Sequence, residues 1–341
     1  MKALILGCGS IGLRHVGHLR QLGLSDIQVA DPNPEARERV QAQFGIHALA
    51  DPEEALAGRP DAVLICTPAD THIPLVEKAL AAGAHVFVEK PLSTSLEGSD
   101  ELLRKVRADG RVVQVGYNLR YHPAVRAAKS ILDSGRLGRV VSADLEFGLY
   151  LPKWWSNRDY RSSYMAKQDM GGGLLLDASH ELDLVLFFLG PVTEVTAYGG
   201  RLSSLEIQGQ DVLKALLWTR ERALVSVHMD CVQPTYTRSF VLIGENAALR
   251  WDCPQGRADG NLGRLLLCDR QMERYEPVTV EGNPSDTYVG ELRDFLDSIS
   301  KGIPSAIGVE SGIEVLRMAM AIEESMRTGA SVRLQQAEAV R

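Results

Sequence analysis

The chain has 341 residues, of which 45% are hydrophobic and 24% charged, with a formal net charge of −7. Such a composition is typical of a globular protein of about two domains and excludes a disordered, collagen-like or coiled-coil chain. The excess of 44 Asp and Glu over 37 Lys and Arg argues against a broad nucleic-acid surface, which needs a basic field, but allows a small anionic ligand in a local pocket.

The cysteines and the apolar runs bear on the cellular compartment of the protein. The five cysteines are an odd number without a C-x-x-C pair, so we expect neither a disulfide framework nor a metal site. The N-terminal apolar run leads straight into a glycine motif, which favours a first strand over a signal peptide. The longest later apolar run, 184–189, is far too short to span a bilayer. We therefore expect a cytoplasmic protein that contacts no membrane.

The first third of the chain alternates strand and helix signals. Apolar strands are predicted at 3–6, 27–30, 62–66, 85–88 and 112–115, separated by helices at 11–22, 35–44, 73–82 and 96–109. Continuous apolar strands joined by helices of this length predict a parallel, doubly wound α/β sheet covered on both faces. Its ligand crevice should lie at the carboxyl ends of the strands.

After about residue 118 the pattern changes to alternation. Residues 140–149 place Ala143, Leu145 and Phe147 on one face and Asp144 and Glu146 on the other. Further strands are predicted at 195–198, 212–218, 223–231 and 240–243, helices at 123–134, 174–189, 288–300 and 311–328, and mostly loop with an edge strand or two at 256–286. Alternation of this kind predicts an antiparallel sheet with one face on a core.

A glycine motif follows the first predicted strand and opens the first helix. Its residues, Gly7-Cys8-Gly9-Ser10-Ile11-Gly12, fit G-x-G-x-x-G in the context that a dinucleotide-binding loop requires. The first glycine permits a tight turn, the second lets the backbone approach a pyrophosphate, and the third lets helix and strand pack closely. The helix N-terminus supplies N–H groups for the phosphates.

Asp31 ends the second predicted strand, 19 residues after the last glycine of the motif. A carboxylate there accepts hydrogen bonds from the adenosine ribose hydroxyls and repels a 2′-phosphate, so NAD is favoured over NADP. Arg37 and Arg39 are near enough in sequence to keep NADP as an alternative.

Glu89-Lys90-Pro91 follows the fourth strand, at the edge where a nicotinamide would lie. A lysine there can donate to a substrate oxygen and stabilise negative charge as a hydroxyl becomes a carbonyl. The alternative is an exposed loop lysine, the commonest fate of that residue.

Five segments in order resemble the Gfo/Idh/MocA family of oxidoreductases: GCGSIGLRH, CTPADTHIPLVEKALAAGAHVFVEKPL, GYNLRYHPAV, GGGLLLDASHELD and the closing helices with TGASVRL. The resemblance implies a Rossmann domain at 1–118 and, at 119–341, an α+β domain with a large, mostly antiparallel open sheet. It implies NAD(P)-dependent oxidation or reduction of a sugar, cyclitol or nucleotide-sugar hydroxyl. It also implies that Thr67, Pro68, Glu89 and Lys90 flank the dinucleotide, with Lys90 reaching the substrate.

Family members carry an aspartate and a histidine four residues apart on one helix, with the histidine as acid and base. Here Asp177 and His180 are three apart, whereas the spacing from His180 to Asp183 matches the family. The simplest alignment therefore places a one-residue deletion between Asp177 and His180, and both spacings keep two side chains on one helix face. An ungapped alignment would put Glu181 at the catalytic position, and a third alternative is that neither residue serves.

Weaker signals concern the substrate. Asn118 and Arg120, at the start of the second domain, line the pocket or brace the domain junction. Trp155, Arg158 and Arg161 lie in an aromatic and basic stretch that suits a sugar ring and an anionic group. The variant of the helix motif also resembles members associated with surface-glycan synthesis.

Three functions compete. The first is an NAD-dependent sugar dehydrogenase or reductase, the second a dinucleotide-binding sensor without turnover, and the third an enzyme with tightly bound NAD and no net redox reaction. Lys90 and His180 together argue against a sensor. The open sheet of the second domain needs covering, so we expect a homodimer or homotetramer.

Overall fold

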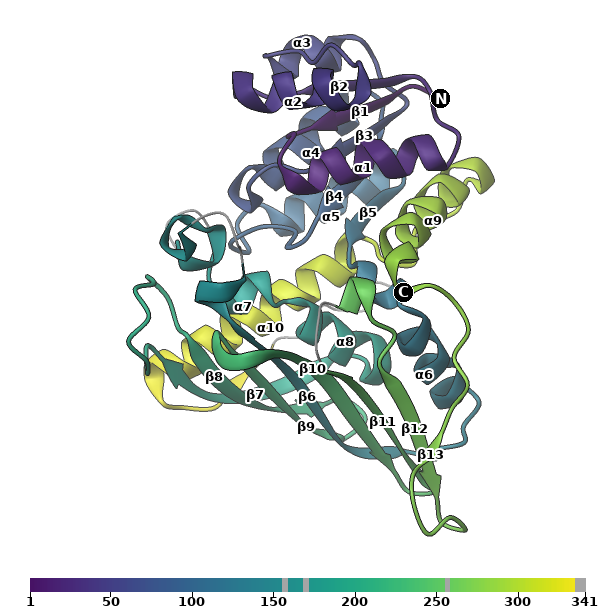
Figure 1. Cartoon of the computed structure of the whole chain (residues 1–341), viewed down its shortest axis with the longest axis vertical. Helices are drawn as coiled ribbons and strands as arrows, with labels where there is room; N and C mark the ends of the chain where they lie inside the picture. The colour runs from purple at the N-terminus through teal and green to yellow at the C-terminus, as the bar shows by residue number, and fades with distance from the viewer. Residues whose placement is uncertain (155–158, 168–171, 255–257, 335–341) are drawn as a thin grey trace. The chain divides into compact units, whose positions relative to one another are not determined.

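The structure, a computed structural model, describes residues 1–154, 159–167, 172–254 and 258–334. The chain forms two compact units (Figure 1). The first comprises Met1–Asn118 and Tyr288–Leu316, and the second Leu119–Thr287 and the chain from Arg317 on. In addition to the expected 1–118, the first unit includes residues 288–316.

The first unit is built on a parallel sheet with the strand order β2-β1-β3-β4-β5 among the described residues. These strands are β1 (Ala3–Leu6), β2 (Ile27–Ala30), β3 (Ala62–Ile65), β4 (His85–Glu89) and β5 (Val113–Gly116). Every residue of β1 and β3 is buried, as expected for strands covered on both faces. The order 2-1-3 makes the space beyond the carboxyl ends of β1 and β3 the switch point at which such sheets bind ligands.

Helices from distant parts of the chain cover this sheet. They are α1 (Ser10–Gln21), α2 (Pro34–Phe44), α3 (Pro52–Ala57), α4 (His72–Ala81), α5 (Ser99–Asp109) and α9 (Thr287–Lys301). Leu292 and Phe295 of α9 are fully buried in the same apolar cluster as Ile5, Leu64 and Phe87 of the strands. This packing explains why the late segment belongs to the first unit, since α9 supplies part of the cover that the sheet needs.

The second unit is built on a sheet with the order β13-β12-β11-β10-β6-β9-β8-β7-β14 among the described residues. Its strands are β6 (Val140–Tyr150), β7 (Val192–Gly200), β8 (Val212–Thr219), β9 (Leu224–Asp230), β10 (Val232–Gly244), β11 (Ala247–Pro254), β12 (Arg264–Asp269), β13 (Glu276–Pro277) and β14 (Val332–Arg333). Within this sheet, the β6–β9 pairing is the only parallel one among the described ladders. The expected large, mostly antiparallel sheet is confirmed.

The two faces of this sheet differ. The predicted core face of β6 is confirmed, because Ala143, Leu145 and Phe147 are buried. Helices α6 (Pro123–Asp133) and α8 (His180–Leu189), together with the part of α10 (Val309–Thr328) from Arg317 on, lie on one side of the sheet in Figure 1. The opposite side, which we call the outer sheet face, exposes large apolar side chains in adjacent strands: Tyr198, Leu216, Trp218, Leu224 and Ile243.

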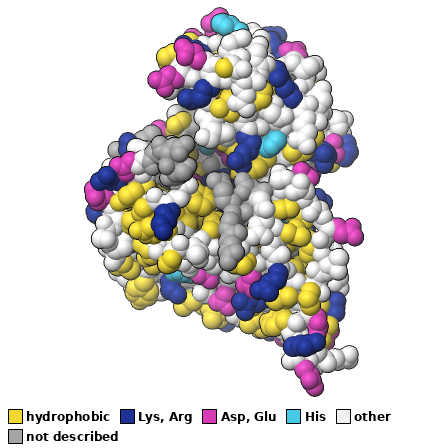
Figure 2. All heavy atoms as spheres, in the orientation of Figure 1, with side chains coloured by type: hydrophobic (Ala, Val, Ile, Leu, Met, Phe, Trp, Pro, Cys, Tyr) yellow, Lys and Arg dark blue, Asp and Glu magenta, His cyan; other side chains and the backbone are white. Residues whose placement is uncertain are grey.

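On the face that Figure 2 shows, Lys and Arg side chains lie among Asp and Glu rather than in a stripe. Among the described residues, no helix is both long and apolar enough to cross a membrane.

His122 fixes the start of α6 with a neutral imidazole. Its Nδ1 accepts the Ala124 N–H at 3.2 Å, and its Nε2 lies 3.1 Å from the Asn261 carbonyl oxygen. The proton therefore sits on Nε2, and a second proton on Nδ1 would remove the cap. Burial lowers the pKa of His122 from 6.5 to about 4.

This cap makes the second unit sensitive to acid. Because the pKa of His122 is lower folded than unfolded, stability is lost as the pH falls from about 6.5 towards 4. His122→Asn keeps an N-cap acceptor that does not titrate, so urea unfolding between pH 7 and pH 4.5 should show a smaller loss of stability for this variant. The exposed His47→Asn should retain the wild-type loss. Equal slopes for wild type and His122→Asn would refute the assignment.

Candidate functional site

The glycine loop after β1 has the geometry that its sequence predicts. Gly7 has a φ of +89°, and a Cβ there would lie 2.6 Å from the Cys66 carbonyl oxygen. A Cβ on Gly12 would lie 2.0 Å from the Gly7 oxygen, whereas nothing stands within 4 Å of one on Gly9. Two of the glycines thus allow close packing, and the third leaves open space beside the backbone. Ser10 and Ile11 begin α1, whose N-cap, Gly9, has no side-chain cap. These features suit a pyrophosphate at the helix N-terminus.

Asp31 follows β2 and reaches back to this loop. Its Oδ2 accepts the Cys8 N–H at 2.6 Å, and its Oδ1 accepts the Asn33 N–H at 2.8 Å. The Asp31 side chain is therefore fixed beside the glycine loop, as a ribose-binding carboxylate would be. Arg37, the alternative 2′-phosphate ligand, donates from Nη1 to the carbonyl oxygens of Asp31 and Pro32, both at 2.8 Å.

The loops after β3 and β4 are joined by His72. Its Nε2 lies 2.9 Å from the Thr67 carbonyl oxygen and its Nδ1 lies 2.9 Å from the Pro91 carbonyl oxygen. Burial lowers the pKa of His72, and a neutral imidazole donates only one of these two bonds. The Thr67-Pro68 turn is further held by Thr71, whose hydroxyl lies 2.7 Å from the Thr67 hydroxyl. No role for His72 was predicted from the sequence.

Glu89 ends β4 and lies inside the first unit. It is 8% exposed, and its Oε1 lies 2.7 Å from Nε2 of the fully buried His15. Its Oε2 accepts the Lys90 N–H at 3.2 Å, and the Lys90–Pro91 bond is cis. Lys90 itself is half-buried at the carboxyl edge of the sheet. This geometry places Lys90 one strand away from β3, whose end faces the switch point.

In the second unit, the predicted helix at 174–189 is broken in two. The structure has α7 (Leu174–Asp177) and α8 (His180–Leu189), with Ala178 and Ser179 in a turn between them. The Ser179 N–H bonds the Leu176 oxygen and the Glu181 N–H bonds the Ala178 oxygen, each three residues back. Bonds of this span wind the chain more tightly than an α-helix. The expected single helix over 174–189 is therefore wrong at Ala178 and Ser179, where the tighter winding interrupts it.

Asp177 and His180 lie on the two sides of this turn, and both are half-buried. Glu181, the alternative acid/base, is 1% exposed and forms an ion pair with Arg238 at 2.7 Å. The Arg238 guanidinium also lies 4.6 Å from the centre of the Phe147 ring. The Glu181 carboxylate is therefore buried and engaged by Arg238. His180 is the better acid/base candidate for this reason.

Arg120 forms a second buried pair. Its Nε and Nη2 donate to both oxygens of Asp183 at 2.6 to 3.2 Å, and Asp183 is fully buried. Burial raises the pKa of Asp183 while Arg120 opposes the shift. A guanidinium so engaged braces α8 against the start of the unit. Asn118 is 5% exposed at the end of the first unit.

The expected substrate stretch is only partly described. Trp155 and Arg158 lie outside the described residues. Arg161 is exposed and pairs with Asp159 at 2.8 Å and with Glu206 at 3.3 Å. Its charge is therefore balanced by two carboxylates in this structure.

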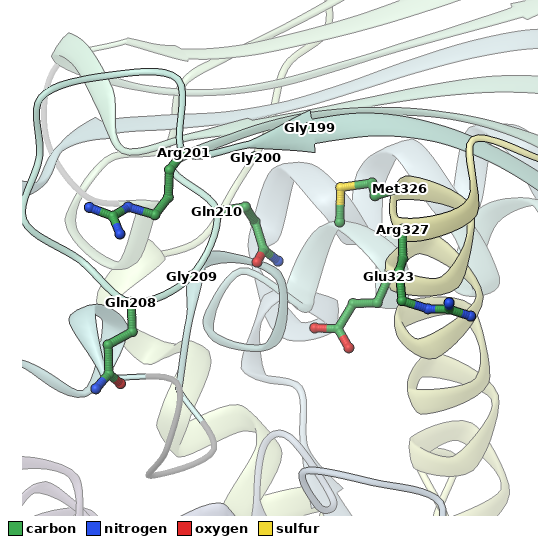
Figure 3. A pocket seen from close by; sticks show the side chains of 9 residues that line it. All are labelled: Gly199, Gly200, Arg201, Gln208, Gly209, Gln210, Glu323, Met326 and Arg327. Carbon is green, nitrogen blue, oxygen red and sulfur yellow. The ribbon is translucent and has the colours of Figure 1, made fainter.

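A surface hollow of about 390 Å³ lies elsewhere in the second unit. Gln210 and Glu323 point into it, whereas Arg201 and Arg327 extend away on opposite sides (Figure 3). None of the predicted site residues lines this hollow, and its two guanidinium groups do not converge on one ligand.

Comparisons with known proteins agree with this architecture. Residues 1–117 match a family described as "Oxidoreductase family, NAD-binding Rossmann fold", and residues 125–250 match the "GFO/IDH/MocA C-terminal domain". A myo-inositol 2-dehydrogenase of Thermotoga maritima is 25% identical over 98% of this chain and 99% of its own length.

Two solved structures show the same fold. A putative NADPH-dependent oxidoreductase from Desulfitobacterium hafniense has a TM-score of 0.87 at 21% identity, over 98% of this chain and 97% of its own. The WlbA dehydrogenase from Bordetella pertussis, solved with NADH and UDP-GlcNAcA, has a TM-score of 0.81 at 23% identity, over 98% and 99%. With both of its domains matched and its glycine loop intact, the chain belongs to the GFO/IDH/MocA family of oxidoreductases and has an NAD-binding Rossmann domain.

Proposed function

We propose that this protein transfers a hydride between NAD and a hydroxyl or keto group of a sugar, cyclitol or nucleotide sugar. The observation that carries this proposal is the position of Lys90, which follows β4 at the same sheet edge as the glycine loop after β1. The substrate class is supported by relatives named for an inositol and for a nucleotide sugar acid.

The residues of the first unit fit NAD. The N-terminus of α1 and the open space at Gly9 suit the pyrophosphate, and the fixed carboxylate of Asp31 suits the ribose hydroxyls. Thr67, Pro68 and Glu89 flank the same edge. NAD supplies a carbon that accepts or returns a hydride. Lys90 would hold the substrate oxygen and stabilise the negative charge that develops on it.

His180 would take the proton from the substrate hydroxyl, or return it, either directly or through Asp177. A histidine suits this role because its ordinary pKa lies near working pH. The burial of Glu181 against Arg238 supports His180 over Glu181. We propose substrate contact for Asn118, Trp155, Arg158 and Arg161, and a bracing role for Arg120 because Asp183 occupies its guanidinium.

We infer that the protein works in the cytoplasm and associates with itself. All five cysteines are free thiols, which persist in a reducing compartment. On the outer sheet face, Leu216 is 52% and Tyr198 is 69% exposed. Apolar side chains clustered in this way favour association, and a second copy of the same face is complementary to them.

The test of the function is turnover. The purified protein is mixed with NAD and a panel of sugars, cyclitols, sugar acids and nucleotide sugars, and the absorbance of NADH is followed. A rise with one class establishes the chemistry. Tight NAD binding without a rise for any class would favour a sensor or a permanently bound cofactor instead.

The first prediction from the proposed function concerns the cofactor. Asp31→Asn removes the charge that repels a 2′-phosphate, so kcat/KM for NADP relative to NAD should rise about tenfold or more, which corresponds to about 1.4 kcal/mol. The exposed Asp26→Asn is the control and should not change the ratio. An unchanged ratio in Asp31→Asn would remove Asp31 from the ribose site.

A second prediction separates chemistry from stability. Lys90→Ala should lower kcat about 100-fold or more while NAD binding persists, and His180→Ala should lower it by a similar factor at a nearly unchanged melting temperature. Glu181→Gln should mainly lower the melting temperature, because it weakens a buried pair. The surface variant Lys105→Ala is the control. Full activity of Lys90→Ala or of His180→Ala would disprove the corresponding role.

A third prediction concerns association. Leu216→Glu places a charge in the middle of the apolar outer sheet face and should shift the molar mass measured by light scattering from dimer or tetramer towards monomer. The exposed Leu202→Glu lies off this face and is its control. A wild-type protein that is monomeric at micromolar concentration would contradict the proposed association.

A further inference from the structure

Three titratable side chains from distant segments meet inside the first unit. His15 comes from α1, Glu89 from the end of β4 and Glu291 from α9, and one imidazole nitrogen and one oxygen of each carboxyl group lie within 4.8 Å of one another. His15 and Glu291 are fully buried, and Glu89 is 8% exposed. This arrangement, which we call the buried triad, has no counterpart in the sequence motifs, because Glu291 stands some 200 residues after Glu89.

Glu291 is the unusual member. Neither of its carboxyl oxygens has a hydrogen-bond donor in the structure, although its backbone oxygen accepts from Gln114 Nε2 at 2.9 Å. A buried carboxylate without donors is costly, and a second carboxylate within 4.8 Å adds repulsion. A carboxylic acid avoids both costs, because it is neutral and has an O–H to donate.

The other groups described around Glu291 give its carboxyl oxygens no donor. His15 directs Nε2 to Glu89 at 2.7 Å, and its Nδ1 has no hydrogen-bond partner. The Cys66 thiol faces both carboxyls, and burial followed by these charges raises its pKa well above the ordinary value. His72, on the other side of Glu89, is neutral because burial lowers its pKa.

A metal ion explains the triad less well than a proton does. Two ligands of one ion with bonds of about 2.1 Å lie about 3 Å or more apart. The 2.7 Å between His15 Nε2 and Glu89 Oε1 is instead a hydrogen-bond distance.

We propose that Glu291 keeps its proton in the native protein and donates it to Glu89, so that Glu291 is a positioning residue for Lys90. Glu89 then accepts from His15, from Glu291 and, at 3.2 Å, from the N–H of Lys90 itself. Burial, and next the charge of Glu89, raise the pKa of Glu291 well above its ordinary value, which supports the assignment. The link to Lys90 rests on the proposed function, whereas the retained proton does not.

The retained proton has a signature in stability that needs no activity. Because the pKa of Glu291 is higher folded than unfolded, the folded state holds one more proton above about pH 4.5, and stability falls as the pH rises until the folded pKa is reached. Glu291→Gln keeps the shape and a donor but cannot titrate. The folded-to-unfolded ratio of wild type should therefore fall relative to that of Glu291→Gln by up to tenfold per pH unit.

Urea unfolding of both proteins from pH 5 to pH 9 measures this difference. Phe295→Leu, at another buried position of α9, is the control and should lower stability equally at every pH. Parallel curves for wild type and Glu291→Gln would overturn the proposal. So would one equivalent of a metal ion that elemental analysis finds in wild type and not in Glu291→Gln.

The positioning role is tested by kinetics. Glu291→Leu should lower kcat about tenfold or more with little change in KM for NAD, and Glu291→Gln should restore most of kcat. If the kcat of Glu291→Leu is no lower than that of Phe295→Leu, Glu291 has no positioning role and contributes only to packing. If Lys90→Ala proves fully active while the stability curves diverge, the proposed function fails and the retained proton stands. If Glu291→Leu does not fold, Glu291→Met takes its place in the same comparison of kcat with Phe295→Leu and Glu291→Gln.

Discussion

The carboxylate of Glu89 is the point on which the interior of the first unit depends. It ends β4, meets the fully buried imidazole of His15 on α1, and lies next to Glu291 on α9. A carboxylate this deeply buried is stable only when donors surround it. The fold therefore brings α1 and α9 to the end of β4. The backbone N–H of the neighbouring Lys90 is held there by its hydrogen bond to Glu89. Phe295 and Leu292 pack into the apolar cluster and hold α9 against the sheet. The same helix therefore supplies both Glu291 and part of the apolar core.

Much of this architecture could be predicted from sequence, because periodicity reports burial directly. The apolar runs of β1 and β3 and the alternation of β6 are each dictated by which faces are covered. The glycine loop was equally readable, since a Cβ at Gly7 or Gly12 collides with backbone. No strand was predicted at β11, although Leu249, Trp251 and Cys253 alternate with polar residues in the same way as the core face of β6 does.

What could not be predicted depends on pairing between distant residues. The sequence around Glu181 does not indicate its pairing with Arg238, and the sequence around Arg120 does not indicate its pairing with Asp183. These ion pairs nevertheless determine which charged side chains are available to act on a substrate. The same holds for the return of residues 288–316 to the first unit. Helical periodicity shows that α9 has an apolar face, but it does not say which sheet that face covers.

The break between α7 and α8 changes the local winding of the chain between Asp177 and His180. An aspartate and a histidine four residues apart share a face of an α-helix, and three residues apart they share a face of a tighter one. The chain adopts the tighter winding only at Ala178 and Ser179 and resumes an α-helix from His180. Because α8 is then anchored by Asp183 to Arg120 and by Glu181 to Arg238, His180 lies at the start of a helix that two buried ion pairs hold in place.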